Sequence, residues 1–356
     1  MAQKRRSVAS PKSARVRPAM NPLQRVRAVL EGLPVDRIPN FDIFMTRAAH
    51  HIGATLSTYY LDHRVLCAAN LAVLEQFHLD IVQAISDPYR EAADTGLTVE
   101  FPEDGLPVSR TPLINEPSQL EEVRFPASAF GPRMTDRLEA IRALRQAVGD
   151  EVPVMGWVEG ALAEAADLRG MSQVMMDLVT NPAWLKELLE KCTEVEVAFA
   201  RAQVRAGAHI VGLGDAVASQ ISPAMYREFA LPYERRIFDA VRAEGGLARL
   251  HVCGNTTHLL ADMPASGADI VDVDWMVDLR RAVDADGSAV ICGNIDPVGV
   301  LLRGIPAEVR TAVRANAAAG RGRWISAAGC EVPDGTPDAN LHAQHLALCE
   351  LGGRSS

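Results

Sequence analysis

Short apolar segments alternate with longer amphipathic segments along most of this chain. Six apolar segments have the length and composition of buried strands, at 152–158, 209–214, 246–254, 269–274, 288–295 and 323–329. Segments with the apolar spacing of helices lie around them, at 133–148, 161–206, 223–244, 255–266, 276–284, 306–319 and 337–351. Strands separated by helices predict a parallel sheet covered by helices.

The N-terminal third adds two further strand candidates. A helix is predicted to begin at Pro22 with Asn21 as its N-cap, and residues 35–44 and 79–85 then have strand-like patterns. Residues 91–130 are rich in proline and glycine and are predicted to form loops. Eight strands in total predict a single α/β domain over residues 21–356, a closed (β/α)8 TIM barrel. A doubly wound open sheet is the alternative, but no GxGxxG or GxxxxGK[ST] motif supports it.

The charge of the chain is distributed unevenly. The formal net charge is −9, but residues 1–20 contain six basic residues and no acidic one. The remaining residues therefore carry a net charge of −15. We interpret residues 1–20 as a basic, disordered tail on an acidic domain. An acidic domain argues against nucleic-acid binding, which requires a basic surface.

Composition also bears on the cellular setting. No apolar run approaches the roughly 20 residues of a membrane span, and the basic tail is not followed by the apolar stretch of a secretory signal. Six cysteines in 356 residues are too few for a disulfide scaffold. The sequence therefore predicts a cytoplasmic protein with reduced thiols, whose cysteines serve in packing, metal binding or reactivity.

Polar residues are concentrated where the predicted strands end. In a parallel barrel these carboxyl ends form one rim, which carries the chemistry. The residues at this rim are Glu159, Asp215, His251, Cys253, Asp272, Asp274, Asn294, Asp296, Cys330 and Glu331. His251 and Cys253 share one face of their strand because alternate residues do so, and closure of the barrel could bring Cys330 to the same point.

The spacing of these three residues leaves two interpretations open. Imidazole and thiolate groups are good zinc ligands, and three protein ligands with an open fourth position are typical of catalytic zinc. Alternatively, His251 is a hydrogen-bonded core histidine, and Cys253 and Cys330 are small buried residues. Cys67, Cys192 and Cys349 fall on predicted helices and are interpreted as packing residues.

Three segments resemble the uroporphyrinogen decarboxylase superfamily, and in particular its zinc-dependent, corrinoid-linked methyltransferase branch. They are HVCGNTTHLLADMPASGADIVDVD, GNIDPVGVLLRGIPAEVR and SAAGCEVPDGTPDANLHA. The resemblance covers roughly residues 21–350 and implies a (β/α)8 barrel. It also implies that His251, Cys253 and Cys330 bind zinc. Methyl groups would move between a corrinoid, free or on a partner protein, and a small thiol or methylated substrate.

The resemblance also frames the expected roles of the rim residues. Asp215, Asp272 or Asp274 is expected to orient His251 through its second ring nitrogen. Glu159 is a proton acceptor or an exposed rim acid, and Asn294 could bind substrate. Some methyltransferases place a glutamate where this chain has Trp275. The fourth zinc ligand is therefore open between water, Asp215, Glu331 and Cys292.

Two other functions remain as alternatives. One is a metal-free decarboxylase of the uroporphyrinogen decarboxylase type, but that branch has an arginine-rich N-terminal stretch where this chain carries Arg47 alone. That branch also has a histidine near the last strand, where Gly329, Cys330 and Glu331 stand here. The other alternative is a non-catalytic barrel that binds a corrinoid or a partner protein.

Overall fold

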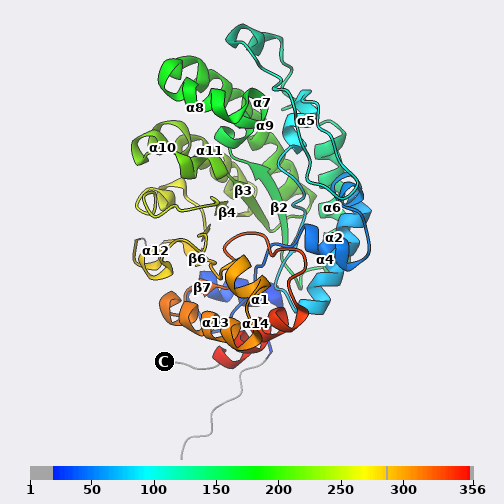
Figure 1. The fold of residues 1–356 in the computed structure, drawn as a ribbon, viewed down its shortest axis with the longest axis vertical. Coiled ribbons are helices and arrows are strands. Elements are labelled where there is room, and N and C mark those ends of the chain that lie inside the picture. Colours follow the sequence, from blue (N-terminus) through cyan, green and yellow to red (C-terminus); the bar gives the residue numbers. More distant parts are fainter. Residues whose placement is uncertain (1–18, 286–287, 353–356) are drawn as a thin grey trace, which may run out of the picture.

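The computed structural model describes residues 19–285 and 288–352, so most of the predicted tail, residues 1–18, lies outside the described residues. A curled parallel sheet forms the centre of the described part (Figure 1). Its seven strands follow one another in chain order and are β1 (Val82–Gln83), β2 (Val154–Glu159), β3 (Ile210–Gly214), β4 (Leu247–His251), β5 (Ile270–Asp272), β6 (Val290–Cys292) and β7 (Trp324–Ile325). The predicted parallel α/β architecture is confirmed.

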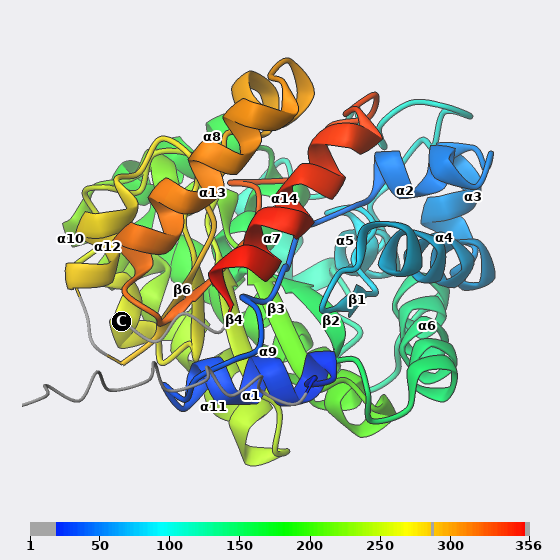
Figure 2. The same ribbon diagram turned by 90° about the horizontal axis from the view of Figure 1, so that it is seen from below.

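Helices surround the sheet on its outer side (Figures 1 and 2). They are α1 (Pro22–Leu30), α2 (Thr46–His51), α3 (Leu56–Leu61), α4 (His63–Phe77), α5 (Arg90–Thr95), α6 (Pro132–Val148), α7 (Ala161–Arg169), α8 (Met171–Thr180), α9 (Pro182–Ala206), α10 (Pro223–Phe229), α11 (Leu231–Ala243), α12 (Leu279–Ala285), α13 (Pro306–Gly320) and α14 (Asp338–Leu351). Shorter helical turns are η1 (Pro117–Glu122), η2 (Ala216–Gln220), η3 (Met263–Ser266) and η4 (Pro297–Leu302). They lie in the connecting segments.

Local sequence signals explain where several helices begin and end. Asn21 caps α1 by accepting a hydrogen bond from the Gln24 backbone nitrogen, as predicted. The helices predicted over 161–206 are α7, α8 and α9, which are separated at Gly170 and Asn181. The predicted helix at 255–266 was wrong over most of its length. Only η3 is helical there, and the residues before it, 257–262, form turns.

A short extended segment lies between the two ends of the sheet. The Phe41 nitrogen donates a hydrogen bond to the Ser326 oxygen at 2.7 Å, just beyond β7. The Asp80 nitrogen donates to the Asn40 oxygen at 2.9 Å, just before β1. Residues 40–43 therefore stand where the first of the eight predicted strands was expected. They form isolated bridges rather than a strand, so seven strands are present in the described part.

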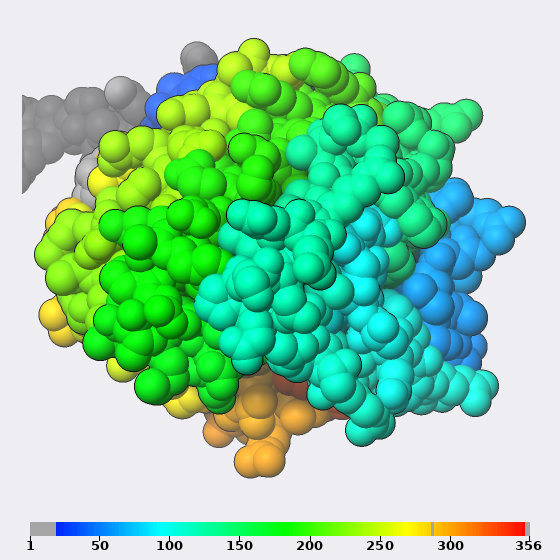
Figure 3. Space-filling view, turned by 90° about the horizontal axis from the view of Figure 1, so that it is seen from above, coloured from blue at the N-terminus to red at the C-terminus, as the bar shows by residue number. Residues whose placement is uncertain are grey.

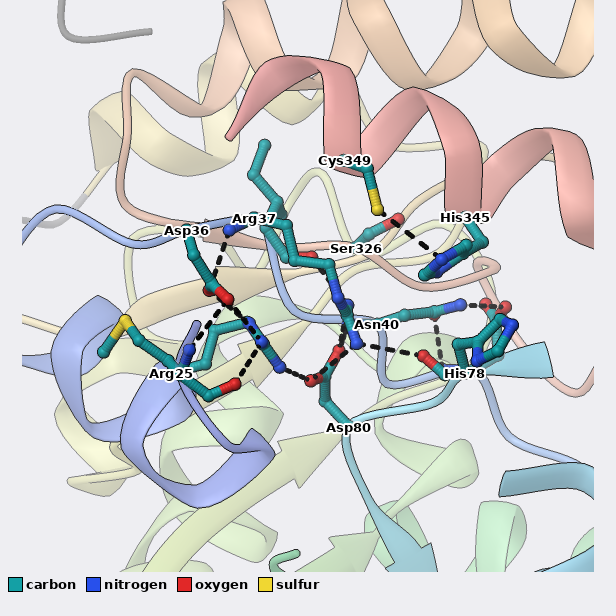
Figure 4. A network of polar contacts seen from close by, with 12 residues as sticks. Arg25, Asp36, Arg37, Asn40, His78, Asp80, Ser326, His345 and Cys349 are labelled. Carbon is teal, nitrogen blue, oxygen red and sulfur yellow. Dashed lines mark hydrogen bonds and ion pairs between the residues drawn. The ribbon is translucent and has the colours of Figure 1, made fainter. Parts of the chain in front are cut away.

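Charged residues at the amino end of the sheet hold this segment in place. Asp80 is fully buried and pairs with both Arg25 and Arg37, and Arg25 also binds Asp36 at 2.8 Å (Figure 4). The Asn40 backbone nitrogen donates a hydrogen bond to the Oδ2 atom of Asp80 at 2.7 Å. We call Arg25, Asp36, Arg37 and Asp80 the amino-end cluster. It joins α1, the residue 40–43 segment and β1.

The apolar core has two parts. The larger part lies between the sheet and its helices. The smaller part fills the inside of the curled sheet with residues from most strands, such as Met155, Ile210 and Ile270, and includes Val26 and Val29 of α1. α1 thus closes the amino end of the sheet, which leaves the carboxyl end for a pocket. No helix among the described residues is long and apolar enough to cross a membrane.

Candidate metal centre and pocket

Three of the predicted site residues meet at the carboxyl end of the sheet. His251 is the last residue of β4, Cys253 lies two residues further on, and Cys330 follows β7. The His251 Nε2 atom is 3.1 Å from the Cys253 sulfur, and the two sulfurs are 3.7 Å apart. All three donor atoms lie within 4.8 Å of one another. The curled sheet brings together residues that are 79 positions apart in the chain.

The donor set fits a zinc ion. One imidazole nitrogen and two cysteine sulfurs are typical zinc ligands, whereas magnesium and calcium prefer oxygen. The second ring nitrogen of His251, Nδ1, lies 2.8 Å from Asp272, so Nε2 is the atom that faces the sulfurs. Arg249, which is fully buried, donates to both oxygens of Asp272. Of the three carboxylates expected to orient His251, the structure brings Asp272 into contact with it.

The contact between the two cysteines makes them electrostatically different. The hydrogen bond from Cys253 lowers the pKa of Cys330 to about 4, although burial opposes this shift, and His251 lowers it further. The same hydrogen bond, together with burial, raises the pKa of Cys253. These shifts favour the thiolate form, which binds metals, at Cys330 rather than at Cys253.

A pocket of about 300 Å³ opens beside these residues. His251, Cys253 and Cys330 form part of its wall, and the apolar and aromatic side chains include Ile85 and Trp157. Leu106 and Pro107 reach the pocket from the loop region after α5. This region covers the surface between the N-terminal helices and the green helices α7–α9 (Figure 3). The metal candidates thus face a largely apolar cavity.

Glu159, the last residue of β2, also lines this pocket. Its Oε1 atom accepts hydrogen bonds from Arg90 at 3.0 Å and from the Trp157 indole at 3.1 Å. Burial raises the pKa of Glu159 to about 8, the nearby Glu91 charge adds to the shift, and Arg90 opposes it. A carboxyl group with such a pKa can accept and release protons near neutral pH.

The other two predicted catalytic residues are placed differently. Asp215 is completely buried under Gly160 and does not line the pocket, and burial together with the Glu234 charge raises its pKa. Asn294 does not line the pocket either. Its side chain donates hydrogen bonds to the backbone oxygens of Asp274 and Val277 at 3.0 and 2.6 Å. Asn294 thus supports the backbone beside the site, whereas the buried carboxylate oxygens of Asp215 have no hydrogen-bond partner.

The remaining rim acids act on nearby backbone. Asp274 accepts a hydrogen bond from the Gly254 nitrogen at 2.7 Å, and Asp296 caps η4. Glu331 lines the pocket, and its Oε1 atom accepts two hydrogen bonds of 2.7 Å from Thr46. Among the three side chains proposed as a fourth ligand, Glu331 is the one that lines the pocket. Cys292 is buried inside the sheet, with its sulfur 3.8 Å from Arg249.

The sequence analysis missed a group of buried charges behind the pocket. We call it the pocket-side cluster, and it consists of Arg90, Glu91, Glu159, Glu164 and Glu196. The carboxylate oxygens of Glu91 and Glu196 have no hydrogen-bond partner. Glu91 lies in the segment 91–130 that was predicted to form loops, but residues Arg90–Thr95 form α5. Glu164 and Glu196 interrupt apolar helix faces. A glutamate within an otherwise apolar helix face was the sequence feature that could have revealed this cluster.

Other predicted roles can now be located. Arg47 pairs with Asp338 and does not line the pocket. Cys67 and Cys192 are buried in α4 and α9, in agreement with a packing role. Cys349 is exposed on α14, so its interpretation as a packing residue was wrong. Its sulfur lies 3.5 Å from the His345 ring on the same helix (Figure 4).

Comparison with known proteins gives two groups of relatives by sequence. The methylcobamide:CoM methyltransferase MtbA of Methanosarcina mazei is 30% identical over 342 residues, which are 92% of this chain and 97% of that protein. The uroporphyrinogen decarboxylase of Xanthomonas axonopodis is 28% identical over 312 residues, 81% of this chain and 85% of that protein. The match to the methyltransferase MtbA covers 92% of this chain, whereas the match to the decarboxylase covers 81%.

Comparison of the folds agrees with the sequences. A solved methyltransferase structure from Methanosarcina mazei superposes with a TM-score of 0.82 at 24% identity, and covers 93% of this chain and 99% of that chain. This likeness concerns the fold. The family model for uroporphyrinogen decarboxylase (URO-D) matches residues 21–348. The predicted resemblance is confirmed, and the chain belongs to the uroporphyrinogen decarboxylase family.

Proposed function

We propose that this protein is a corrinoid-dependent methyltransferase that moves a methyl group from a methylated corrinoid to a small thiol. The observation that carries the proposal is the convergence of His251, Cys253 and Cys330 on the wall of the pocket. The methylcobamide:CoM methyltransferases among its relatives support the same reaction. The corrinoid, free or held by a partner protein, would approach at the open carboxyl end of the sheet.

In this proposal His251, Cys253 and Cys330 hold a zinc ion. When bound, zinc would coordinate the sulfur of the incoming thiol and favour its nucleophilic thiolate form. Asp272 fixes the tautomer of His251 by its contact with Nδ1. Two thiolates and a neutral imidazole balance the charge of the ion. The apolar pocket wall excludes water from the sulfur.

Glu159 is the proposed acceptor for the thiol proton. It is the one member of the predicted catalytic trio that lines the pocket, and its pKa of about 8 suits a group that takes up a proton near neutral pH. Asn294 is assigned a supporting role, because its side chain bonds to backbone oxygens outside the pocket. Asp215 is assigned no catalytic role, because it is fully buried and does not line the pocket.

We also propose how the curled sheet closes into a barrel. We infer that residues 40–43 take the place of an eighth strand, because they bond to the segments next to both β1 and β7. The sheet is then a closed (β/α)8 barrel. Residues 21–356 are proposed as a single catalytic domain, with residues 1–20 as an accessory tail.

Replacement of Cys330 by alanine tests the proposal. The Cys330→Ala protein should lose bound zinc and all methyl transfer from methylcobalamin to thiols, while its melting temperature stays within a few degrees of the parent. Zinc is measured by elemental analysis and transfer by the loss of methylcobalamin absorbance. Cys349→Ala, on the exposed face of α14, is the matched control and should retain both. Transfer by Cys330→Ala at the parental rate would refute the proposal.

A further inference from the structure

The charges around the pocket differ from those expected for an anionic substrate. Among the described residues that line the pocket, Arg90 is the only arginine, and no lysine is present. Its Nη2 atom is 3.0 Å from Glu159 and 3.4 Å from Glu91, so two carboxylates share its positive charge. The remaining guanidinium nitrogens, Nε and Nη1, are buried and have no hydrogen-bond partner. The positive charge of Arg90 is therefore already shared by two carboxylates of the protein.

The carboxylates of the pocket wall outnumber this cation. Asp87 is compensated by Arg133, which lies outside the pocket lining. Glu331 is held by hydrogen bonds from Thr46 rather than by a cation. The rest of the wall is apolar or aromatic, including Tyr60 and Tyr89. Among its arginines and lysines, the described wall thus offers an anion only Arg90, whose charge two carboxylates already share.

An anion would be unfavourable in such a pocket for two reasons. Transfer of a charge from water into an apolar cavity is costly unless a partner of opposite charge compensates it. The nearby carboxylates would add repulsion in a region of low effective dielectric constant. An uncharged group meets neither penalty, and an ammonium group would be attracted both by the carboxylates and by the faces of the aromatic rings.

We propose that the pocket selects a thiol whose non-reacting end is uncharged or positively charged, and disfavours a thiol that ends in a sulfonate or carboxylate. The inference rests on the proposed function, and it narrows the substrate class of the same site. It distinguishes this chain from the relatives named for CoM, because coenzyme M is a thiol with a sulfonate group. Glu159 and Arg90, held together on one wall, set this selectivity.

Three thiols of equal length test the charge preference. The zinc-loaded full chain is given methylcobalamin with 2-mercaptoethanol, 2-aminoethanethiol or 2-mercaptoethanesulfonate, and the rates are normalised for the ionised fraction of each thiol. We expect kcat/KM for the sulfonate to be at least about tenfold below that for 2-mercaptoethanol, because one uncompensated charge contact is worth that factor. Thiol binding to the cobalt(II)-substituted protein, followed by the sulfur-to-cobalt absorption band, gives the same order without turnover.

A charge introduced at the pocket mouth provides the matched variant pair. Leu106 lines the pocket and is 66% exposed, so it tolerates a long polar side chain. Leu106→Arg should tighten binding of the sulfonate thiol about tenfold relative to Leu106→Gln, which has the polarity without the charge. Binding of 2-mercaptoethanol should be equal in both variants.

The results distinguish a failure of the charge selectivity from a failure of the proposed methyltransferase function. If the unmodified chain uses 2-mercaptoethanesulfonate as well as or better than 2-mercaptoethanol, the charge selectivity is refuted while the methyltransferase function stands. If methylcobalamin loses its methyl group to none of the three thiols, the proposed function itself is refuted, and the selectivity with it. Slow transfer to the sulfonate alone among the three supports the selectivity.

Discussion

The two ends of the sheet both bury charged residues, but they do so in opposite ways. In the amino-end cluster two arginines face two aspartates, and Asp80 accepts bonds from both arginines and from the backbone. In the pocket-side cluster Arg90 alone faces several glutamates, and Glu91 and Glu196 lack hydrogen-bond partners. The first arrangement satisfies its charges and stabilises the fold. The second leaves carboxyl groups with raised pKa values next to the pocket.

The two clusters differ in charge balance because the amino end of the sheet maintains the fold and the carboxyl end forms the pocket. A balanced and fully bonded ion cluster has a single preferred geometry, which suits a segment that must hold the sheet closed. An excess of buried carboxyl groups is costly for stability, because each must either ionise without a partner or stay protonated. Glu159, whose pKa burial raises to about 8, can exchange a proton near neutral pH, which suits a site where a thiol must lose its proton.

The largest expected effect is a loss of stability when the amino-end cluster is broken. Asp80→Asn leaves Arg25 and Arg37 without their shared carboxylate, and it should lower the free energy of unfolding by about 3–5 kcal/mol. Urea denaturation measures this change. Asp239→Asn, in an exposed pair with Arg242, is the control and should change stability by less than about 1 kcal/mol. A stable Asp80→Asn protein would mean that the amino-end cluster does not hold the sheet together.

The second prediction concerns metal binding at the carboxyl end of the sheet. Asp272→Asn weakens the contact that orients His251, so zinc affinity should fall about 10- to 100-fold. Competition with a chromogenic chelator measures the affinity. Asp80→Asn, assayed without denaturant at low temperature, should keep parental zinc affinity. Equal losses in both variants would show that the two ends do not divide stability and metal binding between them.

The smallest expected effect concerns the proton acceptor. Burial holds the pKa of Glu159 near 8, so the acceptor form increases as the pH rises through that value. The transfer rate should rise with pH accordingly. Glu159→Gln should flatten this rise and lower the rate at pH 8.5 about tenfold, less than is usual for a general base because zinc already acidifies the thiol.

Glu164→Gln is the control for this pH profile. Glu164 belongs to the same buried cluster but does not line the pocket, so the rise with pH should persist. Its midpoint should stay near that of the parent protein, because burial and the charges of Arg90 and Glu91 set the pKa of Glu159. A flat profile in the parent protein would exclude Glu159 as the proton acceptor.

Sequence patterns predicted much of this molecule for identifiable reasons. Period-two alternation placed His251 and Cys253 on one face, and the alternation of strands with helices indicated a parallel sheet. The choice among Asp215, Asp272 and Asp274 as the partner of His251 was not predictable. It depends on the register of β4 against β5, which sets His251 opposite Asp272. The absence of hydrogen-bond partners for the carboxylates of Glu91 and Glu196 was equally unpredictable, because burial depends on the packing of several helices.

The sequence alone determined the alternating pattern of elements, the types of metal-binding side chain and their place at strand ends. These follow from local geometry, since they depend on residues close together in the chain. Tertiary structure decided that Cys330 reaches His251 and Cys253, that Glu159 rather than Asp215 faces the pocket, and that Arg90 is already occupied. Those features depend on curvature, register and burial, which arise only when distant segments pack against one another.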